Sequence, residues 1–484
     1  MAVSKLRDIL PSAAMPEGVA ALDVAGLTAD SRAVRPGFVF FAVPGAKADG
    51  LSFAAQAQSN GAMAIVAERL PEAPVAGATY IKVADVRAAL AQAAARFHAR
   101  QPDVIAAITG TSGKTSTASF VRQIWQKLGF PSAALGTTGV VTAQGVAYGS
   151  LTTPDPITLH DVLDRLAGDG ISHLAMEASS HGLEQKRLDG VRLAAGAFTN
   201  LSRDHLDYHP DMESYLKAKL RLFDTLLKAG QPAIVDVDGE YGPRVAAACA
   251  EAGLRVCTVG RQGEFIHIET VEAQALSTRL VVSHAGRRFD IALPLAGDFM
   301  ASNALVAAAI CLVTGGKPDA VFAALTSLEG APGRLERVGQ RHGAPIFVDY
   351  AHKPDALEKV LEALRPLAKS RLIVVFGCGG DRDKGKRPIM GAIAVKYADV
   401  AIVTDDNPRS ENPATIRAEI LAAAPGALEI GDRAQAIAQA VAMLKEGDVL
   451  VIAGKGHETG QIVGGTVLPF SDHEEARRAL AEAA

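Results

Sequence analysis

The stretch Ile108-Thr109-Gly110-Thr111-Ser112-Gly113-Lys114-Thr115-Ser116 decides how the rest of this chain is interpreted. The apolar residues 104–108 before it predict a buried strand, and apolar residues at helical spacing follow it from 120 to 128. Glycines in a strand-to-helix turn let backbone N–H groups approach phosphate oxygens. In such a loop a lysine reaches the β/γ-phosphates and a hydroxyl binds Mg²⁺, the roles predicted for Lys114 and for Thr115 or Ser116. The stretch therefore predicts a nucleotide-binding loop. The interval between its glycines is shorter than in the standard Walker A pattern, and an ordinary glycine turn is the competing interpretation.

Length and composition indicate several domains. The chain has 484 residues, whereas one hydrophobic core seldom serves more than about 250–300, so two to four domains are expected. A hydrophobic content of 49% is ample for their cores. Lys and Arg number 49 against 53 Asp and Glu, and the net charge of −4 does not indicate binding to nucleic acid or to anionic membranes.

The cysteines and the apolar runs indicate the cellular compartment. Cys249, Cys257, Cys311 and Cys378 show no Cys-x-x-Cys spacing, so we expect reduced, mostly buried thiols. Charged residues occupy the N-terminus in place of an apolar signal core. The longest apolar run, residues 304–313, is too short to span a bilayer. The chain is therefore expected in the cytoplasm, without a membrane span.

Strand and helix patterns alternate in three successive units, predicted at residues 1–102, 103–330 and 331–484. The first, smaller unit has strands at 39–43 and 64–66, and the third has strands at 372–376, 400–403 and 449–453. This alternation predicts an α/β fold, with a mostly parallel sheet covered by helices on both faces in the central unit and the same pattern in the third. Ligands should gather at the carboxyl ends of the strands.

Polar side chains follow several strands of the central unit. Thr152 and Thr153 lie in a turn stiffened by a proline, where their hydroxyls could bind a sugar phosphate or cap the next helix. Glu177 ends a predicted strand, and its carboxylate would suit Mg²⁺ if that strand neighbours the nucleotide-binding loop. His205 is predicted as a second metal ligand, the alternative being a hydrogen-bonded structural histidine.

A helix predicted over residues 212–228 carries one unusual lysine. Lys219 falls among Tyr215, Leu216, Leu222 and Phe223 on its apolar side. A charged lysine is costly there, so it either extends to water or stays neutral. A neutral lysine can react with CO₂ to form a carbamate, which would supply an anion for the metals.

Three loops rich in glycine and charge follow the strands of the third unit, at residues 377–386, 404–411 and 454–459. Any one of them alone would more often be a solvated loop. Together at strand ends they predict a cleft for polar ligands.

Taken together these motifs resemble those of the Mur ligase family, and the resemblance spans essentially the whole chain. The motifs are Gly-Thr-Ser-Gly-Lys-Thr at 110–115, Met-Glu-Ala-Ser-Ser-His at 176–181, residues 200–209, Asp-Tyr-Ala-His at 349–352 and Asp-Asn-Pro-Arg at 406–409. The resemblance implies an N-terminal UDP-binding domain, a central ATP-binding domain and a Rossmann-like C-terminal domain that binds the incoming amino acid. It also implies a monomeric, ATP-dependent amide ligase of peptidoglycan precursor synthesis. The expected reaction adds meso-diaminopimelate to UDP-N-acetylmuramoyl-L-alanyl-D-glutamate through an acyl phosphate and releases ADP and phosphate.

The family resemblance also implies site residues at the matching positions. The ATP site comprises Gly110, Thr111, Ser112, Gly113, Lys114, Thr115, Ser116, Asn303, Arg334, Asp349 and His352. The UDP-muramoyl-dipeptide site comprises Ser31, Thr152, Thr153, Ser179, Gln185 and Arg187. The meso-diaminopimelate site comprises Arg382, Asp406, Asn407, Pro408, Arg409, Gly454 and Glu458. The metal ligands are Thr115, Glu177, His205 and Lys219 as its carbamate, and the catalytic set is Lys114, Glu177, His205 and Lys219.

Two positions depart from the family pattern, and other functions compete. Ser112 replaces the more usual Asn, and Lys353 stands where Thr is common. Within the class, the alternatives are an L-lysine-adding ligase and a ligase like folylpolyglutamate synthase. Outside it, they are a nucleotide-binding ATPase or regulator and a small-molecule kinase. Neither requires the set Glu177, His205 and Lys219 together with a third domain bearing three ligand loops.

Overall fold

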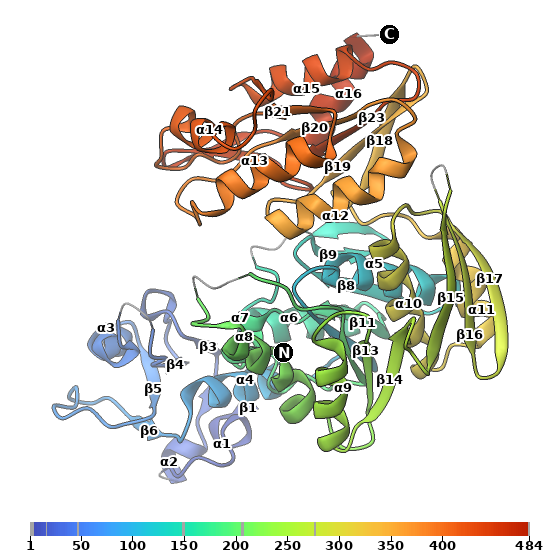
Figure 1. Ribbon diagram of the computed structural model, residues 1–484. Helices are drawn as coiled ribbons and strands as arrows, with labels where there is room; N and C mark the ends of the chain where they lie inside the picture. Colours follow the sequence, from blue (N-terminus) through green and yellow to red (C-terminus); the bar gives the residue numbers. More distant parts are fainter. Residues whose placement is uncertain are drawn as a thin grey trace.

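The computed structural model describes residues 4–15, 17–45, 48–147, 151–204, 208–274 and 277–482. Within these ranges the strands form three main sheets, each lying inside one of the predicted units (Figure 1). The predicted three-domain α/β fold is confirmed, while the boundaries at 102/103 and 330/331 stay predictions. All four cysteines are buried and free, as predicted. In the described part of the chain, no helix combines the length and the apolar character needed to cross a bilayer.

The N-terminal sheet has four parallel strands in the order β3-β4-β5-β6. Side chains alternate along β4, so that Val39 and Phe41 pack on one face while Phe40 packs on the other, as a strand covered on both sides requires. Its strands are β3 (Gly26–Thr28), β4 (Phe38–Phe41), β5 (Ala62–Ala67) and β6 (Tyr80–Lys82), with β1 (Ser4–Lys5) and β2 (Asp23–Val24) paired beside them. Its helices are α1 (Leu6–Ile9), α2 (Glu17–Ala20), α3 (Ala54–Ser59) and α4 (Val86–Phe97).

The central sheet is mixed and has the strand order β10-β9-β8-β11-β7-β12-β13-β14-β15-β16-β17. The seven strands from β8 to β15 in this order are parallel, and the two strands at each edge are antiparallel. The strands are β7 (Val104–Thr109), β8 (Ser132–Gly136), β9 (Gly139–Thr142), β10 (Gly145–Ala147), β11 (His173–Glu177), β12 (Ala195–Phe198), β13 (Pro232–Asp236), β14 (Arg255–Gly260), β15 (Ile266–Ala273), β16 (Thr278–His284) and β17 (Arg287–Leu293).

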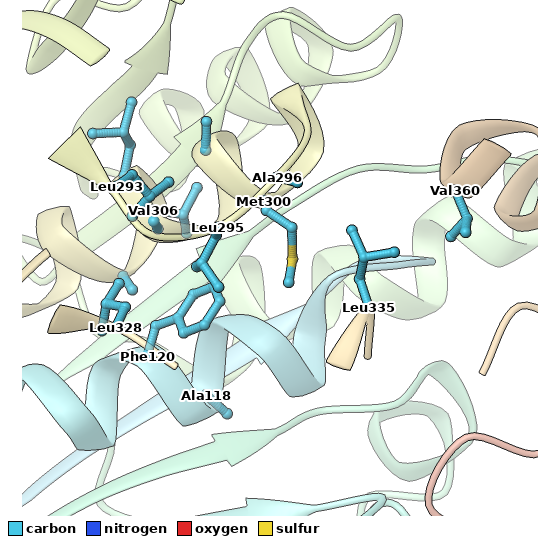
Figure 2. Packing of buried hydrophobic residues seen from close by; sticks show 14 of the residues in the cluster. Ala118, Phe120, Leu293, Leu295, Ala296, Met300, Val306, Leu328, Leu335 and Val360 are labelled. Atoms are coloured by element: carbon cyan, nitrogen blue, oxygen red, sulfur yellow. The ribbon is translucent and has the colours of Figure 1, made fainter. Parts of the chain in front are cut away.

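Helices cover both faces of the central sheet. Ile105 and Ala107 of β7 pack in one cluster with α6, α8 and α9, whereas Ala106 and Ile108 pack in the other with α5 and α10. The helices are α5 (Lys114–Lys127), α6 (Pro156–Gly168), α7 (Ser180–Glu184), α8 (Met212–Arg221), α9 (Gly242–Glu251), α10 (Asp298–Val313) and α11 (Pro318–Ala324). The second cluster continues into the C-terminal domain: Figure 2 shows its members Ala118 and Phe120 from α5, Met300 and Val306 from α10, and Leu335 and Val360 beyond the central sheet.

The helix predicted over residues 212–228 is shorter than expected. The α-helical part ends at Arg221, and a wider π-helical turn follows over Leu222–Leu226. Its N–H···O bond runs from Leu227 to Leu222, five residues back. Leu222, Phe223 and Leu227 all remain buried in this arrangement.

The C-terminal sheet has the order β18-β19-β23-β20-β21-β22, with only the pair β18–β19 antiparallel. Its strands are β18 (Glu336–Arg341), β19 (Ala344–Asp349), β20 (Leu372–Phe376), β21 (Val400–Val403), β22 (Leu428–Glu429) and β23 (Val449–Ala453), and β24 (Gly460–Val463) and β25 (Thr466–Pro469) form a separate hairpin. The helices α12 (Pro354–Leu364), α13 (Lys386–Tyr397) and α14 (Pro413–Leu421) cover one face, and α15 (Arg433–Ala442) and α16 (Asp472–Glu482) cover the other. The predicted strands 372–376, 400–403 and 449–453 are β20, β21 and β23.

Candidate active site

A cleft of about 690 Å³ lies where the carboxyl ends of the central strands face the C-terminal domain. Residues from both domains line it, and they include most of the positions predicted for ATP, for the muramoyl-peptide and for the metal. These are Thr111, Ser112, Gly113, Lys114, Thr115, Ser116, Thr152, Thr153, Glu177, Ser179, Arg187, Asn303, Arg334, Asp349 and His352. The fold thus brings together segments that lie far apart in the sequence.

The nucleotide-binding loop is held in shape by the residues that follow β12. Gly110 has φ 146°, and a Cβ there would lie 2.0 Å from Oγ1 of Thr199. The same Oγ1 donates to the carbonyl oxygen of Ser112 at 2.7 Å, and Asn200 Oδ1 accepts from the Ser112 N–H at 3.0 Å. Only glycine fits at position 110, because the neighbouring strand approaches the loop so closely.

Lys114 opens α5 and folds back over the loop. Its Nζ donates to the carbonyl oxygens of Gly110 (2.8 Å) and Thr111 (2.9 Å). Desolvation lowers the pKa of Lys114 to about 8, and the charge of Glu177 opposes this shift. The amine therefore lies beside the backbone groups that would receive phosphate.

Glu177 lies at the end of β11, next to β7, as predicted. Its buried carboxylate accepts from Thr115 Oγ1 at 2.9 Å, from the Thr137 N–H at 2.8 Å and from Thr137 Oγ1 at 3.1 Å. A hydroxyl and a carboxylate at hydrogen-bonding distance are hard oxygen ligands of the kind Mg²⁺ takes together with phosphates and water. Among the described residues no group of three or more His, Cys, Asp or Glu could hold a metal. Mg²⁺ does not require such a group, so Thr115 and Glu177 fit it.

Lys219 lies on the apolar side of α8, as predicted, and it is buried there rather than extending to water. Its Nζ donates to the carbonyl oxygen of Gly110 at 2.8 Å and lies 4.4 Å from the ring centroid of Tyr215. Burial, and then the nearby charge of Lys114, lowers the pKa of Lys219 well below its ordinary value. A neutral amine is the form that reacts with CO₂. The predicted metal ligand His205 lies in residues 205–207, outside the described part of the chain.

Two of the residues predicted to bind the muramoyl-peptide use their polar groups within the protein. Thr153 Oγ1 donates to the carbonyl oxygen of Glu177 (2.9 Å) and accepts from the Ser179 N–H (3.0 Å). Ser179 Oγ caps α7 by accepting from the Gly182 N–H. The cap of α6 comes from Asp155, so the capping alternative for Thr152 and Thr153 is wrong.

Gln185 and Arg187 interact directly. The Arg187 guanidinium donates to Gln185 Oε1 at 2.8 Å and to the Thr153 carbonyl oxygen at 2.6 Å, and its pKa is lowered, chiefly by desolvation. Thr152 Oγ1 lies 3.0 Å from Thr137 Oγ1, which ties this wall of the cleft to the Glu177 network. An arginine held this way presents its remaining donors to an anionic ligand.

The C-terminal domain reaches into the cleft through residues 334–352. Arg334 donates to Thr115 Oγ1 at 3.4 Å and stacks over the ring of Tyr350 at 4.4 Å. Asp349 accepts from the Leu335 and Ala351 N–H groups, and burial raises its pKa to about 6. Desolvation lowers the pKa of His352 to about 3, so the imidazole is neutral at pH 7.

The residues predicted to bind the amino acid form a second cluster behind Tyr350. The loops meet closely, since a Cβ on Gly380 would lie 1.9 Å from the Pro408 carbonyl oxygen and one on Gly454 would lie 2.5 Å from Asp406 Oδ2. Asn407 and Arg409 both have positive φ, at 45° and 51°. Glu458 accepts from Asn407 Nδ2 at 2.9 Å and from the Tyr350 hydroxyl at 3.4 Å. Tyr350 lines the cleft, so this cluster adjoins the nucleotide site.

Arg409 is held at both its backbone and its head group. Its guanidinium donates to the Gly380 carbonyl oxygen at 2.9 Å. The backbone N–H of Arg409 donates to the Ile462 carbonyl oxygen, and the backbone carbonyl oxygen of Arg409 accepts from the Gly464 N–H. These two bonds join the loop to the β24–β25 hairpin. Desolvation and then the neighbouring Arg382 lower the pKa of Arg409. Arg409 Nη1 and Arg382 Cγ both lie near Gly379, at 2.7 Å and 3.8 Å from a Cβ added there, and two neighbouring arginines suit a carboxylate.

Ser31 is the predicted UDP contact, and it lies in the N-terminal domain rather than among the cleft-lining residues. Its hydroxyl donates to Gln56 Oε1 at 2.6 Å, and Asn60 Nδ2 donates to its carbonyl oxygen. The sequence pattern gave no reason to select Gln56.

Thr137, Tyr350 and Lys455 also belong to these networks, and the sequence analysis assigns no role to any of them. Thr137 carries no motif signal, and Tyr350 stands inside the Asp-Tyr-Ala-His motif without an assigned role, because both roles depend on which loops meet. Lys455 could have been found, since it stands between two glycines directly after a predicted strand.

Comparison with known proteins gives the same assignment along the whole chain. The Mur ligase family catalytic domain matches residues 23–98, the Mur ligase middle domain residues 108–311, and the Mur ligase glutamate ligase domain residues 333–456. A relative from Bradyrhizobium diazoefficiens is 58% identical over 99% of this chain and 99% of its own length, and one from Mesorhizobium japonicum is 56% identical over 99% and 100%. Both are named UDP-N-acetylmuramoyl-L-alanyl-D-glutamate–2,6-diaminopimelate ligase. A solved structure of a protein with that name is 31% identical, covers 99% of each chain and has a TM-score of 0.72. The chain therefore belongs to the Mur ligase family.

Proposed function

We propose that this chain joins meso-diaminopimelate to the D-glutamyl side chain of UDP-N-acetylmuramoyl-L-alanyl-D-glutamate, with ATP as the energy source. The names and high identities of its relatives support this reaction. The observation that carries the choice of amino acid is the arginine pair Arg382 and Arg409 beside Glu458. meso-Diaminopimelate differs from L-lysine by a carboxylate on the distal carbon, and this pair would bind it while Glu458 takes the distal ammonium.

A carboxylate is a poor electrophile, so the D-glutamyl side chain must first be activated. Transfer of the ATP γ-phosphoryl group makes an acyl phosphate, and the amine then displaces phosphate to leave the amide. The loop N–H groups of residues 110–115 and the ammonium of Lys114 would stabilise the transferring phosphoryl group. Arg334 enters from the other domain, and its donation to Thr115 supports a role in closing the site. Closure would exclude water, which otherwise hydrolyses the acyl phosphate.

Thr115 and Glu177 would hold Mg²⁺, together with His205 and Lys219 as its carbamate. Bound Mg²⁺ supplies neutralisation of charge on the phosphate oxygens. The buried, low-pKa Lys219 supports the carbamate, since a neutral amine is required for it. Asn303 would contact the adenine side of the nucleotide by its match to the family motif, and its amide lies against Gly113 of the nucleotide-binding loop.

The remaining positions would divide between the two ends of the nucleotide-sugar peptide. Ser31 would contact UDP from the N-terminal domain. Thr152, Ser179, Gln185 and Arg187 would bind the muramoyl-dipeptide, with Thr153 fixing the turn that carries them. We further propose that the protein acts as a monomer in the cytoplasm.

The deciding experiment measures phosphate release with ATP, the UDP-muramoyl-dipeptide and either meso-diaminopimelate or L-lysine. A site built to pair an arginine with the substrate carboxylate should reject L-lysine, which lacks that carboxylate, by about 10⁴ or more in kcat/KM. Arg409→Ala should raise the KM for meso-diaminopimelate roughly 100-fold and leave that for ATP nearly unchanged, because charged hydrogen bonds contribute about 1.5–3 kcal/mol each. Arg478→Ala on the exposed face of α16 is the matched control. Comparable turnover of the two amino acids by the wild type would refute the assignment.

A further inference from the structure

Lys455 is a fully buried lysine of the C-terminal domain, and its ammonium contacts residues of the proposed amino-acid cluster. It follows β23, a strand in the middle of the C-terminal sheet (Figure 1), and its side chain has no exposed surface. Its Nζ donates to Asn407 Oδ1 at 3.0 Å and to the Gly460 carbonyl oxygen at 2.8 Å. Asp406 Oδ1 lies 3.4 Å away and Glu458 Oε2 lies 3.8 Å away. A buried charge is costly unless paired, and these partners come from the loop 404–411, from the loop of Lys455 itself and from the start of β24.

The first consequence concerns the orientation of the Asn407 amide. An ammonium and a backbone N–H can only donate, and Lys455 Nζ and the Ile462 N–H both lie at Oδ1, the latter at 2.9 Å. The amide therefore has its Nδ2 directed away from them. That Nδ2 donates to Glu458 Oε2 at 2.9 Å, so the position of Lys455 is transmitted to the Glu458 carboxylate.

The second consequence concerns charge. Asp406 and Glu458 are two carboxylates in one partly buried cluster, and burial together with the charge of Asp406 raises the pKa of Glu458. The Lys455 charge opposes that shift and favours the ionised form of Glu458. An ionised Glu458 is the form that binds an ammonium group.

We propose that Lys455 is a positioning residue for the amino-acid substrate: it fixes the Asn407 amide and the Glu458 carboxylate so that they receive the distal ammonium of the diamino acid. This inference rests on the proposed function. Lys455 itself is covered by protein and contacts no substrate. Replacing Lys455 should therefore weaken binding of the amino acid and leave the binding of ATP and of the nucleotide-sugar peptide nearly unchanged.

The test compares steady-state kinetics of the full-length wild type, Lys455→Met and Lys455→Arg, with each of the three substrates varied in turn. Lys455→Met removes the donor and the charge, whereas Lys455→Arg keeps the charge and moves the donors. The KM for meso-diaminopimelate should rise at least about tenfold in Lys455→Met and less in Lys455→Arg, with the other two KM values changing less than about twofold. If Lys455→Met does not fold, Lys455→Arg serves as the test: its KM for meso-diaminopimelate should rise while the other two KM values stay nearly unchanged.

Arg371→Met is the matched control, because Arg371 pairs with the buried Asp448 at the opposite ends of β20 and β23. It should lower stability without a selective change in any KM. Combining Lys455→Met, or Lys455→Arg if needed, with Glu458→Gln should raise the KM for meso-diaminopimelate by less than the product of the single effects, since both act through one carboxylate. Unchanged or uniformly changed KM values in a folded Lys455 variant, or fully additive effects in the double variant, would overturn the inference. Turnover of meso-diaminopimelate by the wild type tests the proposed function separately, so the two failures are distinguishable.

Discussion

Gly136 ends β8 beside Glu177, and adding one methyl group there should displace the Glu177 carboxylate. A Cβ at this position would lie 2.0 Å from Oε1, 2.5 Å from Cδ and 2.6 Å from Cγ of Glu177, whereas real Cβ contacts are essentially never under 3.0 Å. The Glu177 side chain must therefore move by about 1 Å, so its hydrogen bonds to Thr115 and Thr137 cannot all keep their present geometry. Because a buried carboxylate would lose part of its hydrogen bonding, the free energy of unfolding should fall by about 1–3 kcal/mol.

The catalytic cost should be measurable in a protein that still folds. Displacing a catalytic group by about 1 Å can lower a rate roughly 100-fold, so Gly136→Ala should reduce kcat by about that factor and raise the Mg²⁺ concentration needed for half-maximal rate. Phosphate release measured over a Mg²⁺ titration gives both quantities, and urea unfolding gives the stability. Gly18→Ala in α2 is the control, since a Cβ there meets nothing within 4 Å. A folded Gly136→Ala enzyme with wild-type kcat and Mg²⁺ dependence would show that the position of Glu177 does not matter for the reaction.

Three further predictions concern titratable groups. Lys114→Ala should abolish turnover in a folded protein. In the wild type, the KM for ATP should increase when the pH exceeds about 8, because Lys114 then loses its proton, and a KM for ATP that is constant up to about pH 9.5 would contradict this. Lys219→Ala should lose most activity and recover part of it with added short carboxylates, and a high-resolution map with a bare Lys219 ammonium at saturating bicarbonate would count against the carbamate. Burial lowers the pKa of His160 to about 4 from 6.5, so the unfolded chain binds the proton at higher pH and the free energy of unfolding falls as pH drops between these values. Urea unfolding at about pH 7 and about pH 4 measures how much stability is lost between these two pH values, and His160→Phe should make this loss smaller by up to about 3 kcal/mol. An equal loss in the wild type and in His160→Phe would rule out a contribution of His160.

Much of the fold follows from local patterns in the sequence. The strands β20, β21 and β23 are continuous apolar runs bounded by polar loops, which is the pattern of strands buried on both faces, and their ends were predicted correctly. The position of Lys219 on the apolar side of α8 follows from helical spacing alone. The end of that helix does not, because the change to a π-helical turn at Leu222 depends on tertiary packing rather than on local propensity.

The role of a site residue can be predicted from the sequence only where the residue stands in a recognisable motif. Glu177 and Thr115 stand in recognisable motifs, and the parallel pairing of β11 with β7 brings them together. Thr137 holds the same carboxylate but lies in a turn after β8, and nothing in its neighbours indicates which strand β8 will join. The role of Gly136 likewise exists only because β8 pairs with β11. Such roles are set by strand order, which a single sequence does not encode locally.

The hydrogen bonds between Arg409 and the β24–β25 hairpin have a consequence for protein engineering. The main chain of Arg409 is joined to Ile462 and Gly464, so the arginine and the hairpin move as one body although they are distant in the sequence. Transplanting the Asp-Asn-Pro-Arg segment alone into another ligase would bring the guanidinium without the support that aims it. A designer who wishes to exchange amino-acid preference between ligases would have to transfer the loop and the hairpin as a single cassette, and a changed hairpin length would by itself shift where the arginine points.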